Sequence, residues 1–195
     1  MIALVVYAHP VPDSFCSVVR DRVVGSLIAA GHEVDLMDLY AEGFDPRLPV
    51  EEHALHLSGL ETKPAIAGHA RRLSAAEALV LVYPTWWGSQ PAILKGWFDR
   101  VWVEGVAYTL PEGEDRIKPL LRNVRRLVVV TTHGSPKWVN ALQGEPGKRV
   151  VLRGLRSLCH PRARSRWIAL YGIDRSDEEQ RNRFLDRVAS ITARL

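Results

Sequence analysis

The chain has 195 residues, 47% of them apolar and 25% charged, and its formal net charge at pH 7 is +4. This length predicts a single domain over residues 1–195 with a sizeable core. Two cysteines exclude a multi-bridge disulfide framework. No apolar run approaches the ~18 residues of a membrane span, and no signal peptide is visible. We therefore expect a soluble cytoplasmic protein.

Basic residues concentrate in the second half of the chain. Solvated helix faces and loops are the simpler interpretation, and attraction of phosphorylated cofactors is the functional one. No known nucleic-acid reading motif accompanies the charge, so we expect no nucleic-acid partner.

Strand and helix patterns alternate from end to end. Residues 2–8 form a continuous apolar run, typical of a strand covered on both faces. Apolar residues at helical spacing predict a helix over 14–30, and Gly31 suits its C-terminal cap. The further expected elements are a strand at 33–37, an irregular excursion at 39–64 with a short helix at 51–57, a helix at 65–75 and a strand at 78–83.

The second half continues the alternation, with a helix at 91–102 that Pro91 can open and a loop or small hairpin at 104–119. Ser176 and Glu179 match a capping box for the last helix. The remaining expected elements are a strand at 127–132, a loop at 133–147, a helix at 148–158, a strand at 167–171 and a helix at 177–195.

Strands separated by helices predict an α/β fold with a parallel sheet and right-handed crossovers. Five strands in this length suggest a flavodoxin-like sheet, order 2-1-3-4-5, with helices on both faces. Ligands bind such a sheet at the carboxyl ends of its first and third strands. The loops after the first, third and fourth strands should meet there.

The first of these loops runs from Ala8 into a helix and contains His9 and Ser14. Free backbone N–H groups and the helix dipole favour a phosphate at such a helix start, and both side chains could add donors. Helix capping by Asp13 or Ser14 is the simpler, compatible interpretation. No glycine-rich dinucleotide or P-loop motif is present.

The second loop is Pro84-Thr85-Trp86-Trp87-Gly88. Two adjacent tryptophans cannot both point into one core, so they predict a border for a planar ligand, although a lid on the core is the simpler function for a single tryptophan. The third loop is Thr131-Thr132-His133-Gly134-Ser135, whose backbone donors could stabilise negative charge on a bound ring. His133 is a candidate catalytic residue, with a structural loop histidine as the alternative.

These loops, and above all Pro-Ala-Ile-Leu-Lys-Gly-Trp-Phe at 91–98, resemble the NAD(P)H:quinone oxidoreductase family of flavodoxin-like flavoproteins. The resemblance implies non-covalent FMN or FAD, NADH or NADPH as co-substrate, a quinone or similar small-molecule acceptor, and a homodimer. It also implies a set of cofactor-binding residues, with Trp87 and Trp138 expected to contact the substrate: His9, Ser14, Phe15, Cys16, Pro84, Thr85, Trp86, Trp87, Thr131, Thr132, His133 and Gly134.

The chain also departs from that family. Cys16 stands where the family often has asparagine, which removes one side-chain phosphate contact. Mammalian members carry a tyrosine and a histidine that relay charge, whereas this chain has Trp138, Val139, Glu145 and Pro146 near those positions.

Three histidines, His53, His56 and His69, lack the converging ligand set of a metal site, so we expect no metal. Cys16 is interpreted as a small buried filler, with a reactive thiol at the helix start as the alternative.

The leading hypothesis is a flavin-dependent NAD(P)H dehydrogenase acting on quinones. One alternative is a flavin-binding ancillary subunit of a potassium-efflux transporter, and another is an electron-transfer flavodoxin. A surplus of aromatic surface at Trp97, Trp102, Val106 and Tyr108 suggests a dimer, with burial of both tryptophans in the core as the alternative.

Overall fold

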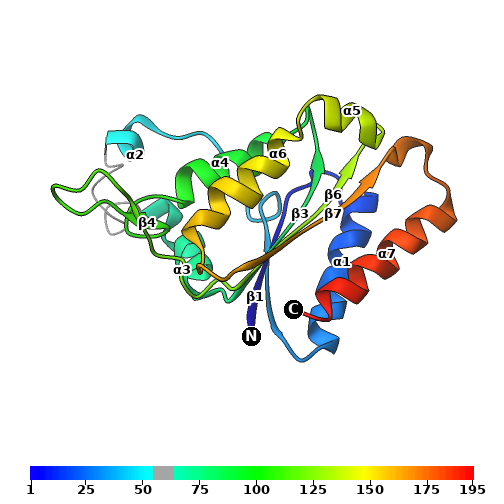
Figure 1. Cartoon of the computed structure of the whole chain (residues 1–195), viewed down its shortest axis with the longest axis horizontal. Helices are drawn as coiled ribbons and strands as arrows, with labels where there is room; N and C mark the ends of the chain where they lie inside the picture. Colours follow the sequence, from blue (N-terminus) through cyan, green and yellow to red (C-terminus); the bar gives the residue numbers. More distant parts are fainter. Residues whose placement is uncertain (55–63) are drawn as a thin grey trace.

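A five-stranded parallel sheet forms the centre of the molecule in a computed structural model, which describes residues 1–54 and 64–195 (Figure 1). Every neighbouring pair is parallel, which confirms the expected fold and strand order. The strand order is β2 (Glu33–Asp38), β1 (Ile2–Tyr7), β3 (Ala78–Thr85), β6 (Arg126–His133) and β7 (Arg164–Tyr171).

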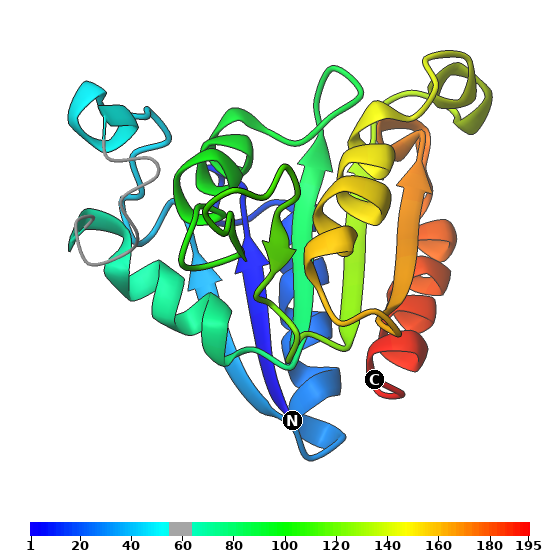
Figure 2. The ribbon, with the colours of Figure 1, turned by 60° about the vertical axis from the view of Figure 1, so that its left-hand side comes forward.

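Helices cover both faces of this sheet. Alternate residues of β1 enter two separate cores: Leu4 packs on one side and Val5 on the other, which explains the uninterrupted apolar run. Figures 1 and 2 show α1 (Phe15–Ala29) and α7 (Glu178–Thr192) on one face, and α3 (Ala67–Ala75), α4 (Ala92–Val101) and α6 (Pro146–Arg149) on the other.

Short elements lie at the periphery. Helix α2 (Val50–Ala54) covers the first part of the helix expected at 51–57, whose remainder lies outside the described residues. Strands β4 (Tyr108–Thr109) and β5 (Lys118–Pro119) pair antiparallel and confirm the small hairpin. The helix expected at 148–158 changes its winding after α6: Val150–Gly154 forms a wider π turn and Leu155–Leu158 a tighter 3-10 turn.

Two local predictions are wrong. The segment expected as a loop at 133–147 contains α5 (Lys137–Leu142), which is too short to show helical periodicity. The capping box of α7 is made by Asp177 and Gln180, one residue beyond the expected pair. Ser176 is engaged elsewhere, because its hydroxyl donates to the Ile173 carbonyl at 2.7 Å.

The aromatic residues of α4 fill the core instead of forming a surface. Trp97 is fully buried and Trp102 is 6% exposed, and their rings meet edge to face with centroids 6.3 Å apart. Val106 is also buried. Such edge-to-face packing accommodates large rings within one small domain. The surplus aromatic surface expected at these residues is therefore absent, and it no longer argues for a dimer.

Within residues 1–54 and 64–195, every helix is too short or too polar to cross a lipid bilayer.

Candidate functional site

A cavity of about 480 Å³ lies at the carboxyl ends of β3 and β6. A second cavity of about 200 Å³ adjoins it, with Thr85, Trp87, Gly134 and Ser135 lining both. The volume of the larger cavity is within the usual range for small-molecule sites. Seven of the expected cofactor residues line one cavity or the other: Pro84, Thr85, Trp86, Trp87, Thr132, His133 and Gly134.

The strands that carry these residues are longer than expected. Pro84 and Thr85 lie in β3, and they pair in register with Thr132 and His133 of β6. The ladder continues because the two parallel strands stay in register to their ends. These side chains therefore project from a rigid sheet edge, and only the Trp86–Gly88 turn and the chain after His133 are loops.

The two tryptophans sit in a tight turn. Trp86 and Ser89 exchange two backbone hydrogen bonds of 3.0 and 3.1 Å. Trp87 has φ of +50° and Gly88 φ of +74°, as in a type I′ turn. A non-glycine residue in this region is strained, and such strain concentrates at functional sites. The Trp87 side chain is fully exposed, so interpreting it as a lid on the core is wrong.

The loop after β1 leads into α1, where Ser14 caps the helix by accepting from the Ser17 N–H at 3.2 Å. The first turn of α1 carries no acidic residue, so its free N–H groups and dipole favour an anion. His9 Nδ1 lies 3.0 Å from the Val11 backbone nitrogen and 3.2 Å from the Val11 carbonyl oxygen, so the backbone of Val11 holds the imidazole in place. The His9 ring lies 6.2 Å from that of Trp86, so the first and second loops meet.

Phe15 and Cys16 turn their side chains toward the core. Phe15 packs against Phe184 at 6.3 Å between ring centroids. Cys16 is 4% exposed, and burial raises the pKa of its thiol to about 12. The interpretation of Cys16 as a filler is supported, because the thiol stays protonated at neutral pH. These two residues could offer a ligand only their backbone N–H groups.

His133 belongs to a polar network that forms part of the wall of the second cavity. Its Nδ1 lies 2.7 Å from Asn140 Oδ1, and its Nε2 lies 3.4 Å from Thr85 Oγ1. Thr85 Oγ1 is in turn 2.8 Å from Thr131 Oγ1. The Tyr171 ring stacks on the imidazole at 4.5 Å. Burial lowers the pKa of His133, and the hydrogen bond with Asn140 and the charge of Glu145 oppose that effect.

Several lining residues escaped the sequence analysis, among them Asp174, Asn140 and Gln143. Asp174 follows β7, so the rule that ligands bind at carboxyl ends of strands could have found it. A Cβ on Gly134 would lie 2.9 Å from Asp174 Oδ2, so glycine permits this close approach. Trp138 is 66% exposed on α5 and lines neither cavity.

Two of the histidines weighed as metal ligands lie in different helices, His53 in α2 and His69 in α3. His69 packs beside Met37, with Nδ1 3.2 Å from the sulfur, and His56 lies outside the described residues. In the part of the chain that the structure describes, no three His, Cys, Asp or Glu side chains converge as a metal site would require.

Fold and site together define a flavodoxin-like protein with a cavity at the carboxyl ends of β3 and β6. A family model described as a flavodoxin-like fold matches residues 1–191. Two solved structures are similar over nearly the whole chain. The Smu.1420 protein of Streptococcus mutans has a TM-score of 0.85, 29% identity and 100% coverage of both chains. The NAD(P)H:quinone oxidoreductase of Methanothermobacter marburgensis has a TM-score of 0.82, 28% identity, and coverage of 99% of this chain and 98% of that one.

Curated relatives with similar sequences are also named as quinone dehydrogenases. The rat protein named NAD(P)H dehydrogenase (quinone) 1 is 34% identical over 167 residues, which are 77% of this chain and 60% of the relative. A human ribosyldihydronicotinamide dehydrogenase (quinone) is 34% identical over 148 residues, 68% of this chain and 63% of the relative. The chain therefore belongs to the flavodoxin-like family whose model matches residues 1–191. It spans less than two thirds of the length of these curated relatives.

Proposed function

We propose that this protein is a flavin-dependent oxidoreductase that transfers a hydride from NADH or NADPH, through FMN or FAD, to a quinone or similar acceptor. The observation that carries the proposal is the cavity at the carboxyl ends of β3 and β6, bordered by the exposed Trp86–Trp87 turn and next to the loop that opens α1. The names of the relatives support this activity, and they do not support the transporter-subunit alternative.

The residues present fit a flavin. The anion-favouring start of α1, with the His9 and Ser14 side chains nearby, would hold its phosphate. The Trp86–Trp87 turn would border the ring and exclude water from it. Thr132 and Gly134 line the cavity on the β6 side, where backbone donors would stabilise negative charge on the ring.

A bound flavin would supply the hydride chemistry, accepting two electrons and a proton from the nicotinamide and passing them to the acceptor. The protein would position the flavin and its second ligand and exclude water from them. Thr85 and Trp87 line both cavities, so they can face a cofactor in one and a second ligand in the other. The expected contact of Trp138 with the substrate stays a prediction, as does the cytoplasmic location.

Purified protein should bind FMN or FAD and oxidise NADPH when menadione is supplied. A spectrophotometric titration measures flavin binding, and the loss of NADPH absorbance measures turnover. No binding of either flavin at tens of micromolar would contradict the assignment of the cavity. Binding without turnover would contradict the enzyme and favour a binding protein.

Replacing Ser14 by alanine should weaken flavin binding about tenfold or more, because a hydrogen bond to a charged group contributes roughly 1.5–3 kcal/mol. The variant also loses a helix cap, at about 0.5–2 kcal/mol of stability. Asp177→Ala is the matched control, since it removes the side-chain cap of the other 15-residue helix, α7. Equal flavin affinity in both variants would remove Ser14 from the phosphate site.

We also propose that the protein is a homodimer, as the resemblance to NAD(P)H:quinone oxidoreductases implies. The exposed rings of Trp87 and Trp138 support this proposal, because a partner subunit could cover them. Light scattering should therefore give twice the 21.9 kDa mass of the chain. A mass of one chain across micromolar concentrations would contradict the dimer.

A further inference from the structure

We propose that Asn140 is a positioning residue, which holds His133 as the Nδ1–H tautomer so that its bare Nε2 exchanges a proton with the Thr85 hydroxyl. The inference deepens the proposed function, on which its catalytic part rests. Neither residue type nor spacing marked Asn140 in the sequence, and it is 4% exposed.

The hydrogen bonds of Asn140 determine which way its amide points. Its Nδ2 donates to the Pro136 carbonyl at 2.9 Å and to the Ser135 carbonyl at 3.3 Å. Carbonyl oxygens only accept hydrogen bonds, so the amide atom that faces these two carbonyls is Nδ2. The amide atom that faces His133 is therefore Oδ1, which can only accept a hydrogen bond. The 2.7 Å bond therefore requires a hydrogen on His133 Nδ1, and the neutral imidazole keeps its lone pair on Nε2.

The charge state of His133 then sets the direction of the hydroxyl chain. When His133 is neutral, Thr85 can donate to Nε2, and Thr131 can donate to Thr85 across 2.8 Å. When His133 is protonated, Nε2–H donates to Thr85 Oγ1 instead. The Thr85 hydrogen is then released toward Thr131 or toward the cavities, both of which Thr85 lines.

This exchange supplies a proton that the reaction needs. A quinone becomes a hydroquinone by gaining two electrons and two protons, and the nicotinamide hydride provides both electrons and one proton. The second proton comes from water and would be held on His133. On transfer, the Nε2–H bond breaks, the Thr85 hydrogen passes to the acceptor oxygen, and Thr85 takes the imidazole proton. His133 returns to its neutral form.

Charged groups around the imidazole tune this step. Tyr171 of β7 stacks on it, and the Tyr171 hydroxyl donates to Glu145 Oε1 at 3.0 Å. Glu145 Oε2 pairs with Lys148 of α6 at 2.7 Å, and Asp174 lies beside Gly134. Burial favours neutral His133, whereas negative charge in the cavity would favour its protonation.

Nitrogen NMR of the flavin-free full chain should show His133 with Nδ1 protonated and Nε2 bare at neutral pH. Asn140→Ala should let the two tautomers mix and lower the pKa of His133. Asn140→Asp should restore the Nδ1–H form and raise that pKa, because its carboxylate still accepts and adds negative charge. A wild-type Nε2–H tautomer, or an unchanged tautomer in Asn140→Ala, would overturn the positioning role.

With flavin bound, Asn140→Ala should lower kcat about tenfold or more and leave flavin affinity unchanged. An acid–base group usually contributes about 10²–10⁴-fold to the rate, and a residue that only positions such a group should contribute less. Asn140→Asp should recover much of kcat and shift the pH profile upward. Asn123→Ala is the matched control. The Asn123 Nδ2 also donates to backbone carbonyls, including Ser74 at 2.7 Å, but Asn123 is bonded to none of the histidines that the structure describes. That variant should lose stability and keep kcat.

The two proposals fail separately. A wild-type protein without flavin binding or turnover sinks the proposed function, while the NMR result still decides whether Asn140 positions His133. Turnover with unmoved kcat and pH profile in both Asn140 variants leaves the function standing and overturns the proton exchange.

Discussion

Replacing Glu52 by alanine should lower the free energy of unfolding by about 3–5 kcal/mol, because it leaves a buried guanidinium without its carboxylate. The side chains of Arg100 and Glu52 are only 7% and 12% exposed. Arg100 Nε donates to Glu52 Oε2 at 2.9 Å, and the guanidinium also donates to the Asp45 carbonyl and lies over the Phe44 ring at 5.3 Å. This network ties α2 and the 44–47 segment to α4.

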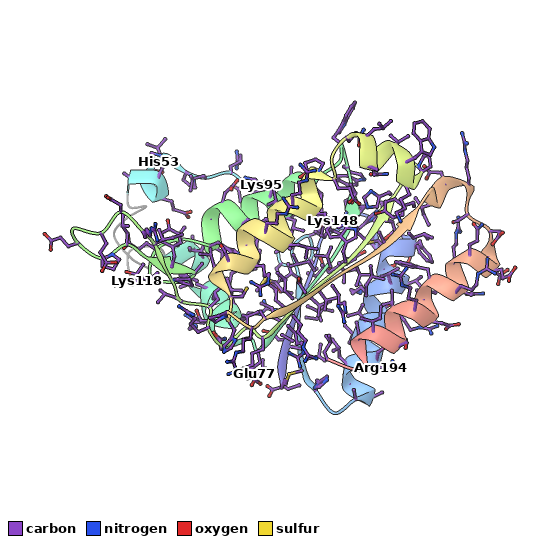
Figure 3. All side chains as sticks on the ribbon, viewed as in Figure 1. His53, Glu77, Lys95, Lys118, Lys148 and Arg194 are labelled. Carbon is purple, nitrogen blue, oxygen red and sulfur yellow. The ribbon has the colours of Figure 1, made fainter. Side chains whose placement is uncertain are left out.

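The matched control is an ion pair on the same helix. Lys95 and Asp99 of α4 are 53% and 47% exposed, and Figure 3 labels Lys95 on the outside of that helix. Asp99→Ala should therefore change stability by no more than about 1 kcal/mol. Urea denaturation followed by circular dichroism measures both variants. A loss in Glu52→Ala as small as that in Asp99→Ala would show that the buried pair contributes no more than the exposed one.

Replacing Trp87 should separate stability from turnover. Because the ring is fully exposed, Trp87→Ala removes no core packing and should melt close to the wild type. Its turnover should fall roughly tenfold or more, since a stacking aromatic contributes about 1–3 kcal/mol. Trp87→Phe keeps a ring and should retain most of the activity.

Trp87→Gly adds a second readout at the same position. Glycine adopts a φ of +50° without strain, so the substitution should remove about 1–2 kcal/mol of backbone strain from the folded state. This gain should outweigh the cost of the greater conformational freedom of glycine in the unfolded chain, which is about 0.5–1 kcal/mol. The variant should therefore be as stable as the wild type or slightly more so, yet as slow as Trp87→Ala. Equal turnover per bound flavin in wild type, Trp87→Ala and Trp87→Gly would remove Trp87 from the site.

Local patterns were enough to predict the sheet and the edge at which the site lies. The uninterrupted apolar runs of β1, β3 and β6 require cover on both faces, and strands alternating with helices then allow few topologies. Because parallel strands end at a common edge, residues as distant as Trp86 and Thr132 could be expected to line one cavity, as they do.

Directions of side chains depended on the tertiary structure. The positions of Trp97 and Trp102 in the sequence indicate an apolar surface, but they do not indicate what covers it. In the structure the core of the same chain covers both side chains. Asn140 lies in a helix too short to leave a periodic pattern, and its function depends on a partner, His133, held on another element. Hydrogen-bond partners are decided by angles and by distances of a few ångströms, and the order of residues in the sequence contains neither. Only the folded chain could therefore pair Asn140 with His133 and Glu52 with Arg100.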